Sequence, residues 1–166
     1  GYTGDEKEIE HSKNMINILY NKKRSIPKKY EDIRKRYNSI ATDGFDLISC
    51  QFSLHYYFKS EETLRNYLEN ISNSCKKGGY FIWTCYDGID LLRLFGDDNI
   101  IEYNKDGKLV YKLQKVKISD FKYDKDDLSN KDDISNMFGT SIKVYMDSIG
   151  DEYEEYLVNF EFFIDI

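Results

Sequence analysis

The stretch "FDLISCQFSLHYYF", Phe45–Phe58, begins as a short, nearly continuous apolar run and ends in polar and aromatic side chains. An apolar run of this length after the turn residues "TDG" is typical of a strand buried on both faces in a parallel sheet. Open α/β sheets bind their ligands at the carboxyl ends of such strands. We therefore expect a binding site to begin directly after this strand.

The next segment, "KSEETLRNYLENISNSCKKGG", has the pattern of an amphipathic helix. Ser60 can cap its start, Glu61 and Glu62 suit the positive end of the helix dipole, and the lysines and glycine of "KKGG" mark its end. Its expected apolar stripe consists of Leu64, Tyr67, Leu68, Ile71 and Cys75.

The following segments repeat this alternation. "YFIWTC" has the composition of a second buried strand, and "GIDLLRLFG" predicts a second short helix after the turn "YDG". Strand, helix, strand and helix in this order imply right-handed crossovers and a parallel sheet. The predicted fold class is therefore α/β.

Beyond Gly96 the pattern changes. "IIEYN", "KLVYKLQKVKI" and "SIKVYMDSI" alternate apolar and polar residues, which predicts an antiparallel β addition. We expect the intervening "DKDDLSNKDDIS" to be mobile and "DEYEEYLVNFEFFIDI" to begin a further element. Upstream, "DEKEIEHSKNMINILYNKK" and "YEDIRKRYNSI" predict two helices separated by Pro27.

A chain of 166 residues is long enough for one domain, or for part of a larger one. We divide it into a helical, basic lead-in (1–44), a β-α-β-α core (45–96) and an antiparallel insertion with the start of a further element (97–166). The N-terminus lacks the pattern of a signal peptide and no apolar run is long enough for a membrane span, so we expect an intracellular protein. The three cysteines lack metal-site spacing, and we interpret them as reduced, packed thiols.

The net charge of −6 argues against a general nucleic-acid coat. The charge is uneven, because residues 22–36, "KKRSIPKKYEDIRKR", are strongly basic whereas "DDLSNKDD" and "DEYEE" are acidic. Two interpretations of the basic run stay open: a solvated face or loop, and a patch that contacts phosphates. The sequence contains no HExxH, GxGxxG or P-loop, so neither a hydrolase nor a nicotinamide enzyme is indicated.

Three strings in this order, "SCQFSLHYYF", "GGYFIWTCYDG" and "EEYLVNF", resemble the mRNA cap guanine-N7 methyltransferases over roughly Phe45–Phe160. "TCYDG" replaces the "TTPNS"-like string of cellular members, so that Tyr86 stands where proline is common. The sequence from "ATDGFD" to "TCYDG" is more similar to that of members from large DNA viruses. The resemblance implies a partial Rossmann-like class I methyltransferase fold that depends on S-adenosyl-L-methionine, with capped RNA as substrate. It also implies a nuclear location, or a cytoplasmic replication site for a viral protein.

The family's glycine-rich adenosylmethionine loop and its upstream acidic residues have no match in residues 1–44, and its last strands lie beyond Ile166. We therefore expect the second half of a methyltransferase domain, inactive alone and completed by further sequence or by a partner, such as the remainder of a capping enzyme or a stimulatory subunit. A binding module that holds capped RNA without catalysis is the competing class, and a small-molecule methyltransferase is a third.

Site roles follow from the resemblance. Gln51 and Tyr56 match positions that contact adenosylmethionine, and His55 matches a donor to guanine O6. Glu155 matches the carboxylate that accepts from guanine N1–H and N2–H, and Phe52 would form an apolar wall beside the cap. Ser53 and Tyr57 would be neighbours of this cap site without an assigned role. Read without the family, these residues would be a strand-end cap, packed aromatics, a histidine without a direct role and a solvated acid. No nucleophile or metal is expected, because guanine N7 carries a lone pair and no proton, so that proximity and orientation suffice.

Overall fold

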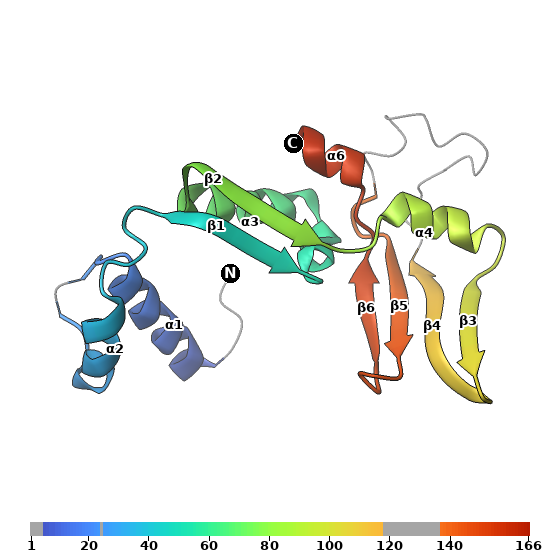
Figure 1. The fold of residues 1–166 in the computed structure, drawn as a ribbon, viewed down its shortest axis with the longest axis horizontal. Coiled ribbons are helices and arrows are strands. Elements are labelled where there is room, and N and C mark those ends of the chain that lie inside the picture. Colours follow the sequence, from blue (N-terminus) through green and yellow to red (C-terminus); the bar gives the residue numbers. More distant parts are fainter. Residues whose placement is uncertain (1–4, 24, 118–136) are drawn as a thin grey trace. The chain divides into compact units, whose positions relative to one another are not determined.

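We analysed a computed structural model of the chain, which describes residues 5–23, 25–117 and 137–166. The chain forms two compact units (Figure 1). The first comprises the residues up to Ile48 together with Ile71–Phe81, and the second comprises Ser49–Asn70 together with Ile82–Ile166. The sequence-based division at residues 44 and 96 stays a prediction.

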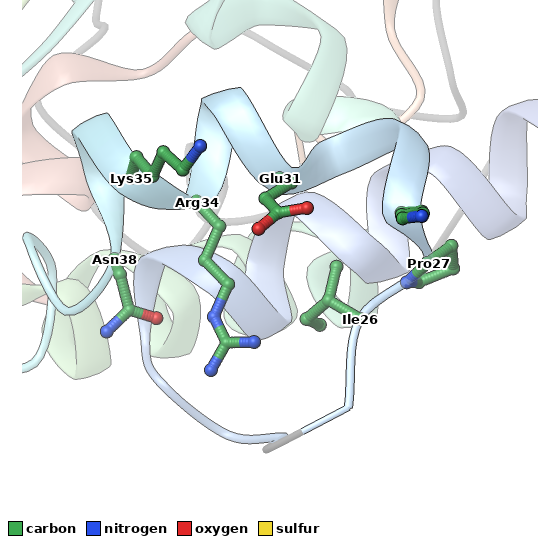
Figure 2. Close-up of a pocket in the computed structure, with 7 residues that line it drawn as sticks. Ile26, Pro27, Glu31, Arg34, Lys35 and Asn38 are labelled. Carbon is green, nitrogen blue, oxygen red and sulfur yellow. The ribbon is translucent and has the colours of Figure 1, made fainter.

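The first unit is built on a pair of short helices. Helix α1 (Glu6–Leu19) is capped by Asp5, whose carboxylate accepts from the backbone N–H groups of Lys7 and Glu8 at 2.9 Å. The turn η1 (Lys28–Tyr30) leads into α2 (Glu31–Tyr37), and Figure 2 shows the side chains of α2 at this end of the unit. Both predicted helices are confirmed.

Backbone hydrogen bonds join these helices to the segment that precedes the sheet. The N–H of Ser39 donates to the carbonyl of Ile18 at 3.1 Å, and that of Ala41 donates to Leu19 at 3.0 Å. Ile18 and Ala41 are fully buried. The hairpin of helices is therefore a packed structure with its own small core.

Strands β1 (Phe45–Gln51) and β2 (Cys75–Thr84) form a two-stranded sheet, and α3 (Glu61–Ser74) is their crossover. The strands run in the same direction (Figure 1). Gly79 lies so close to β1 that a Cβ there would come within 3.0 Å of the carbonyl oxygen of Phe45. Ser60 caps α3 as predicted, since its hydroxyl accepts from the N–H of Thr63 at 3.2 Å. The predicted strand, helix and strand are confirmed.

Two details of this prediction are wrong. We expected both strands to be buried on both faces, but Leu47 is 54% exposed, Tyr80 72% and Ile82 46%. Along both strands exposed residues alternate with less exposed ones, and Cys50 on β1 is buried, so one face of the pair is left largely uncovered in the described part of the chain.

The end of α3 is the second correction. The helix ends at Ser74, so that Cys75 and the "KKG" residues belong to β2 and not to the helix. Lys76 bonds both carboxylate oxygens of Asp46 on β1 at 3.0 Å. Pairing with β1 therefore outweighs the local helix-ending pattern at these residues.

The second unit contains an antiparallel sheet in the order β3-β4-β5-β6. The strands are β3 (Ile100–Lys105), β4 (Lys108–Lys117), β5 (Ser141–Met146) and β6 (Glu152–Tyr156). The antiparallel addition is confirmed, with "EYEEY" as its fourth strand and α6 (Phe160–Asp165) as a final helix. The prediction for "DKDDLSNKDDIS" lies outside the described residues.

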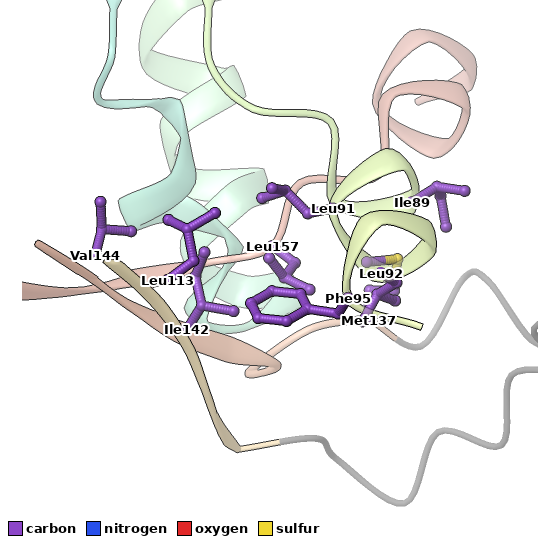
Figure 3. Packing of buried hydrophobic residues seen from close by; sticks show 9 residues of the cluster. All are labelled: Ile89, Leu91, Leu92, Phe95, Leu113, Met137, Ile142, Val144 and Leu157. Atoms are coloured by element: carbon purple, nitrogen blue, oxygen red, sulfur yellow. The ribbon is translucent and has the colours of Figure 1, made fainter. Parts of the chain in front are cut away.

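Helix α4 (Gly88–Phe95) covers one face of this sheet and forms the core shown in Figure 3. The core residues are Ile89, Leu91, Leu92, Phe95, Leu113, Met137, Ile142, Val144 and Leu157. Gly88 donates its N–H to the carbonyl of Val158 at 2.7 Å. A Cβ at Gly88 would meet Met137 Cε at 2.8 Å and Leu157 Cβ at 2.9 Å, so only glycine lets α4 start this close to the end of β6.

The cysteines carry free thiols, with Cys50 buried and Cys75 and Cys85 half-buried, as the sequence predicts. In the parts of the chain that the structure describes, no helix combines the length and the apolar character that a membrane span requires.

Candidate functional site

The site begins where the chain leaves β1. Phe52 adopts φ of 50°, a left-handed conformation that is rare for a bulky side chain, and its N–H donates to the carbonyl of Thr84 at 2.8 Å. This turn leads into the 3-10 helix η2 (Leu54–Lys59), in which Leu54, His55 and Phe58 are buried. The ring of Phe52 remains 71% exposed. The turn thus directs one aromatic side chain outward and one imidazole inward.

Strand β6 supplies the other side of the site. Tyr153 pairs with Val144 and Glu155 pairs with Ile142, and both partners belong to the core under α4. Because side chains alternate along a strand, Tyr153 and Glu155 share that face of the sheet. Glu154 points to the opposite face, where Ser141 donates to its carboxylate at 2.6 Å. The two adjacent glutamates therefore have different surroundings.

These residues meet around a cavity of about 480 Å³. Its lining comes from η2, the end of β2, and the β5–β6 hairpin: Phe52, His55, Tyr56, Cys85, Tyr86, Met146, Ser148, Ile149, Tyr153 and Glu155. The volume lies in the range of small-molecule sites. Four of the residues singled out in the sequence are therefore brought together: Phe52, His55, Tyr56 and Glu155.

His55 and Glu155 are the polar pair at the centre of this set. His55 Nδ1 lies 3.7 Å from Glu155 Oε2, too far for a hydrogen bond but close enough for electrostatic contact. Burial lowers the pKa of His55 and raises the pKa of Glu155. An ion pair would shift both pKa values the other way, so desolvation outweighs attraction and we describe the imidazole as neutral.

The second ring nitrogen of His55, Nε2, has an unusual environment. Nε2 is buried and has no hydrogen-bond partner among the described residues. The ring of Tyr56 packs on the imidazole with centroids 4.2 Å apart. A buried polar atom without a partner costs about 1–3 kcal/mol and is unusual outside functional sites.

The remaining sequence candidates lie outside the cavity lining. Gln51 accepts from Thr84 Oγ1 at 2.7 Å and donates to Ser49 Oγ at 2.9 Å, which holds its amide at the end of β2. Ser53 lies 3.2 Å from the Cys50 thiol, and the ring of Tyr57 stacks on Tyr67 at 3.6 Å. Ser53 and Tyr57 therefore have packing contacts of their own.

Six lining residues were not proposed from the sequence. Tyr153 was within reach of the argument, because it lies two positions before Glu155 on one face of a strand. In the sequence, Tyr86 stands out only because it departs from the family pattern. Met146, Ser148 and Ile149 come from the β5–β6 hairpin, and only the strand register brings them to this place.

The chemistry of the lining is that of a recognition site. Burial, with electrostatic contributions from Cys50, Asp87 and Glu155 adding to it, raises the pKa of the Cys85 thiol to about 12, so this thiol is protonated at neutral pH. Burial and then Glu155 raise the pKa of Tyr86. The described residues contain no cluster of three or more His, Cys, Asp or Glu that could hold a metal ion. Aromatic walls and one carboxylate suit a planar ligand that donates hydrogen bonds.

The fold and the cavity thus define an α/β protein with a ligand site after a parallel strand. A sequence model of the mRNA (guanine-N(7))-methyltransferase domain matches residues 10–166. The chain therefore belongs to the mRNA (guanine-N(7))-methyltransferase family. Together with the parallel pair β1 and β2 and their crossover helix, this membership confirms the prediction of a partial, Rossmann-like methyltransferase fold.

Individual relatives agree with the family model. The mRNA cap guanine-N(7) methyltransferase of Candida glabrata is 33% identical over 119 residues, covering 70% of this chain and 26% of that protein. That of Candida albicans is 31% identical over 117 residues, covering 70% and 23%. A probable mRNA-capping enzyme of Acanthamoeba polyphaga mimivirus is 43% identical over 44 residues, covering 26% and 4%. The chain thus aligns with about a quarter or less of the length of these relatives.

Proposed function

We propose that this chain carries the cap-recognition site of an mRNA cap guanine-N7 methyltransferase. One observation carries the proposal: His55 and Glu155, far apart in the sequence, line one cavity with Phe52 and Tyr56 in a chain of this family. The substrate is capped RNA, and the reaction places a methyl group on N7 of the cap guanine.

Glu155 is the residue that would select guanine. Its two carboxylate oxygens can accept from N1–H and N2–H of the same base, a pair of donors that adenine does not offer on that edge. Its side chain is 18% exposed, so such hydrogen bonds form in a partly desolvated place and are stronger than in water.

His55 would hold the guanine from the adjoining side. A neutral imidazole has one N–H donor and one acceptor nitrogen, and the acceptor O6 of guanine is complementary to that donor. The unpartnered Nε2 supports a ligand contact, whereas Nδ1 at 3.7 Å supports a second role in orienting Glu155.

Phe52, Tyr86 and Tyr153 supply flat apolar surfaces around the same space. Aromatic rings stack on a nucleobase whatever its sequence context, each stack contributing about 1–3 kcal/mol. These side chains would fix the plane of the guanine, and the two polar side chains would fix its rotation within that plane. Holding N7 in this way is the main catalytic contribution that the chain's own residues can make.

The methyl donor that we propose is S-adenosyl-L-methionine, with Gln51 and Tyr56 as its contacts. The lining fits a sulfonium, because it contains one carboxylate and three tyrosine rings and no Lys or Arg. When bound, adenosylmethionine would supply an electrophilic methyl group for the lone pair of N7, with adenosylhomocysteine as the leaving group. The two hydrogen bonds of Gln51 to Thr84 and Ser49 hold its amide in place for such a contact.

Other capping activities, on the same polypeptide or on a stimulatory subunit, are the partners we propose. The location that follows is intracellular, in the nucleus or at a cytoplasmic site of viral replication.

A second candidate is a non-catalytic subunit that holds capped RNA or stimulates a catalytic partner. Retention of capped RNA needs only the site around His55 and Glu155, which lines one cavity in this chain, and it does not need a methyl donor.

Transfer of labelled methyl from adenosylmethionine to GpppA-capped RNA tests both candidates, with ApppA-capped RNA as the base-specific control. The protein should be the whole encoded polypeptide, compared with its Glu155→Gln variant and with Glu154→Gln as a matched control. Label at guanine N7 that only Glu155→Gln abolishes supports the enzyme. Retention of GpppA-capped RNA without transfer supports the second candidate, and neither activity overturns both.

A further inference from the structure

The basic segment 22–36 has no role in the site around Glu155. It contains eight basic and two acidic residues, a net charge of +6 in a chain of −6, so that the remaining residues carry −12. Such a separation of charge concentrates the attraction for a polyanion on one segment and repels it elsewhere.

The structure places part of this segment around a second cavity, of about 680 Å³, in the first unit. Lys28, Arg34 and Lys35 contribute cations to its lining, and Glu31, Asn38 and Pro27 contribute other groups. Glu31 and Arg34 extend from α2, and Asn38 from the residue that follows it, to the same side of the helix (Figure 2). Cationic, anionic and amide groups therefore face one hollow.

The backbone that carries these cations is fixed. Tyr30, between Lys28 and Glu31, is 4% exposed, and its hydroxyl lies 3.1 Å from His11 Nδ1 on α1. The N–H of Tyr30 donates to the carbonyl of Pro27 at 2.9 Å. Of the two readings of the basic run, the loose solvated loop is therefore disfavoured for residues 27–38. Cations on an ordered support can bind a ligand at a lower entropic cost.

The surroundings favour a nucleotide chain over a small anion. Glu31 would repel a free phosphate, but beside three cations its carboxylate can accept from a ribose 2′-hydroxyl or a base amino group. Asn38 offers both a donor and an acceptor, and the ring of Tyr37, next to it in sequence, is 44% exposed and available for stacking.

We propose that this cavity binds the sugar-phosphate backbone of the RNA body, at a site separate in composition from the site around Glu155. The inference rests on the proposed function for its substrate, since a cap methyltransferase must hold an RNA chain behind the cap. Its binding itself requires no cap. The cations carry affinity by displacing counterions from phosphates, and they carry little sequence preference.

The test is binding of uncapped 12-nucleotide oligoadenylate to the full chain, followed by fluorescence anisotropy over a range of salt concentrations. Lys28→Ala, Arg34→Ala and Lys35→Ala are combined in one variant. We expect affinity at low salt to fall at least tenfold, and the slope of log affinity against log salt to decrease by about 2, from roughly 0.7 per lost single-strand contact. The matched control changes three exposed lysines of the antiparallel sheet, Lys105, Lys108 and Lys117, to alanine.

Equal losses in both triple variants, or no change in the first, would overturn the proposal. Competition by inorganic phosphate at the concentration of oligoadenylate phosphates would overturn it in favour of a small-anion site, and equally tight binding of polyglutamate would overturn it in favour of an acidic protein partner. Methylation of the dinucleotide GpppA, which lacks an RNA body, should be the same in wild type and variant. Because the oligoadenylate assay contains no cap and no methyl donor, a failure of the proposed function leaves this result readable.

Discussion

The cavity around Glu155 and the cavity around Arg34 use charge in opposite ways. In the first, burial raises the pKa of Glu155 and lowers that of His55. The binding energy of these desolvated groups therefore depends on where a ligand places its hydrogen-bond donors and acceptors. In the second, Lys28 on η1 and Lys35 on α2 are exposed charges, and Lys35 Nζ lies 3.8 Å from the carboxylate of Asp32. Desolvated hydrogen bonds discriminate between bases, whereas exposed cations provide attraction that salt weakens. The contrast teaches that base selectivity and RNA affinity can be built in separate places and varied separately.

Replacing Glu155 should cause the largest loss of guanine binding in the cavity around Glu155. In Glu155→Gln one acceptor of the fork becomes a donor that opposes guanine, and we expect affinity for the cap dinucleotide GpppA to fall on the order of 100-fold. Isothermal titration calorimetry measures this loss. Glu154→Gln, which changes a carboxylate held by Ser141 outside the cavity, should bind within about twofold of wild type. Similar losses in both variants would remove Glu155 from the site.

The Glu155→Gln variant, although it binds GpppA more weakly, should be at least as stable as wild type. Because the pKa of Glu155 is raised on folding, its contribution to stability is present at pH below about 4.5 and is lost as the pH rises through the folded value. At neutral pH the ionised carboxylate is a cost, so Glu155→Gln should melt at the same temperature as wild type or higher.

Acidification provides the next largest effect. The carboxylate must be ionised to accept two hydrogen bonds, so GpppA affinity should fall about tenfold per pH unit below the pKa of Glu155, which lies above 4.5. His55 also faces this carboxylate, and its lowered pKa keeps it neutral until the medium is more acidic than usual for histidine. Tyr86 stays neutral throughout, because burial raises its pKa. A pH profile of Glu155→Gln that follows that of wild type would contradict this assignment.

Two substitutions of His55 separate its proposed roles. His55→Asn keeps a polar group near the position of Nδ1, and His55→Gln keeps one near Nε2. If the contact to guanine runs through Nε2, His55→Gln should retain most of the GpppA affinity, whereas His55→Asn should lose about tenfold. The opposite ranking would mean that the imidazole acts mainly by orienting Glu155, and equal wild-type affinities would exclude both roles.

Replacing Phe52 should have the smallest effect on GpppA binding, and it should raise stability while it weakens binding. Glycine adopts φ of 50° without strain, so Phe52→Gly should raise the free energy of unfolding by about 1 kcal/mol, as measured by urea denaturation. The same change removes an aromatic wall of the cavity and should weaken GpppA binding several-fold. Phe52→Leu, which keeps the strain but not the ring, is the matched variant. A destabilised Phe52→Gly would show that the ring is held by packing and not exposed for a ligand.

The sequence predicted the elements of this chain better than their surroundings. Ser60 before α3 was predicted as a local capping residue, whose effect does not depend on the rest of the fold, and this cap forms. The burial of Leu47 and Tyr80 was predicted wrongly, because exposure depends on which elements cover a strand and not on the strand's own composition.

The site was predictable to the extent that it is contained in short motifs. His55 and Glu155 were found through the strings around them, although only the β5–β6 register and the turn at Phe52 bring them within 3.7 Å. That turn was not foreseen, since a left-handed conformation is expected at glycine or asparagine and not at phenylalanine. Met146 and Ile149 reach the cavity through long-range pairing, which no local pattern records.

Cys85 bears on how this cavity could be blocked by a drug-like compound. Because its pKa is raised to about 12, this thiol carries very little reactive thiolate at pH 7, so electrophilic groups aimed at this cysteine would react slowly despite its place in the lining. A reversible inhibitor is the better design, with paired N–H donors directed at Glu155 and a flat ring system to lie against Phe52 and Tyr86.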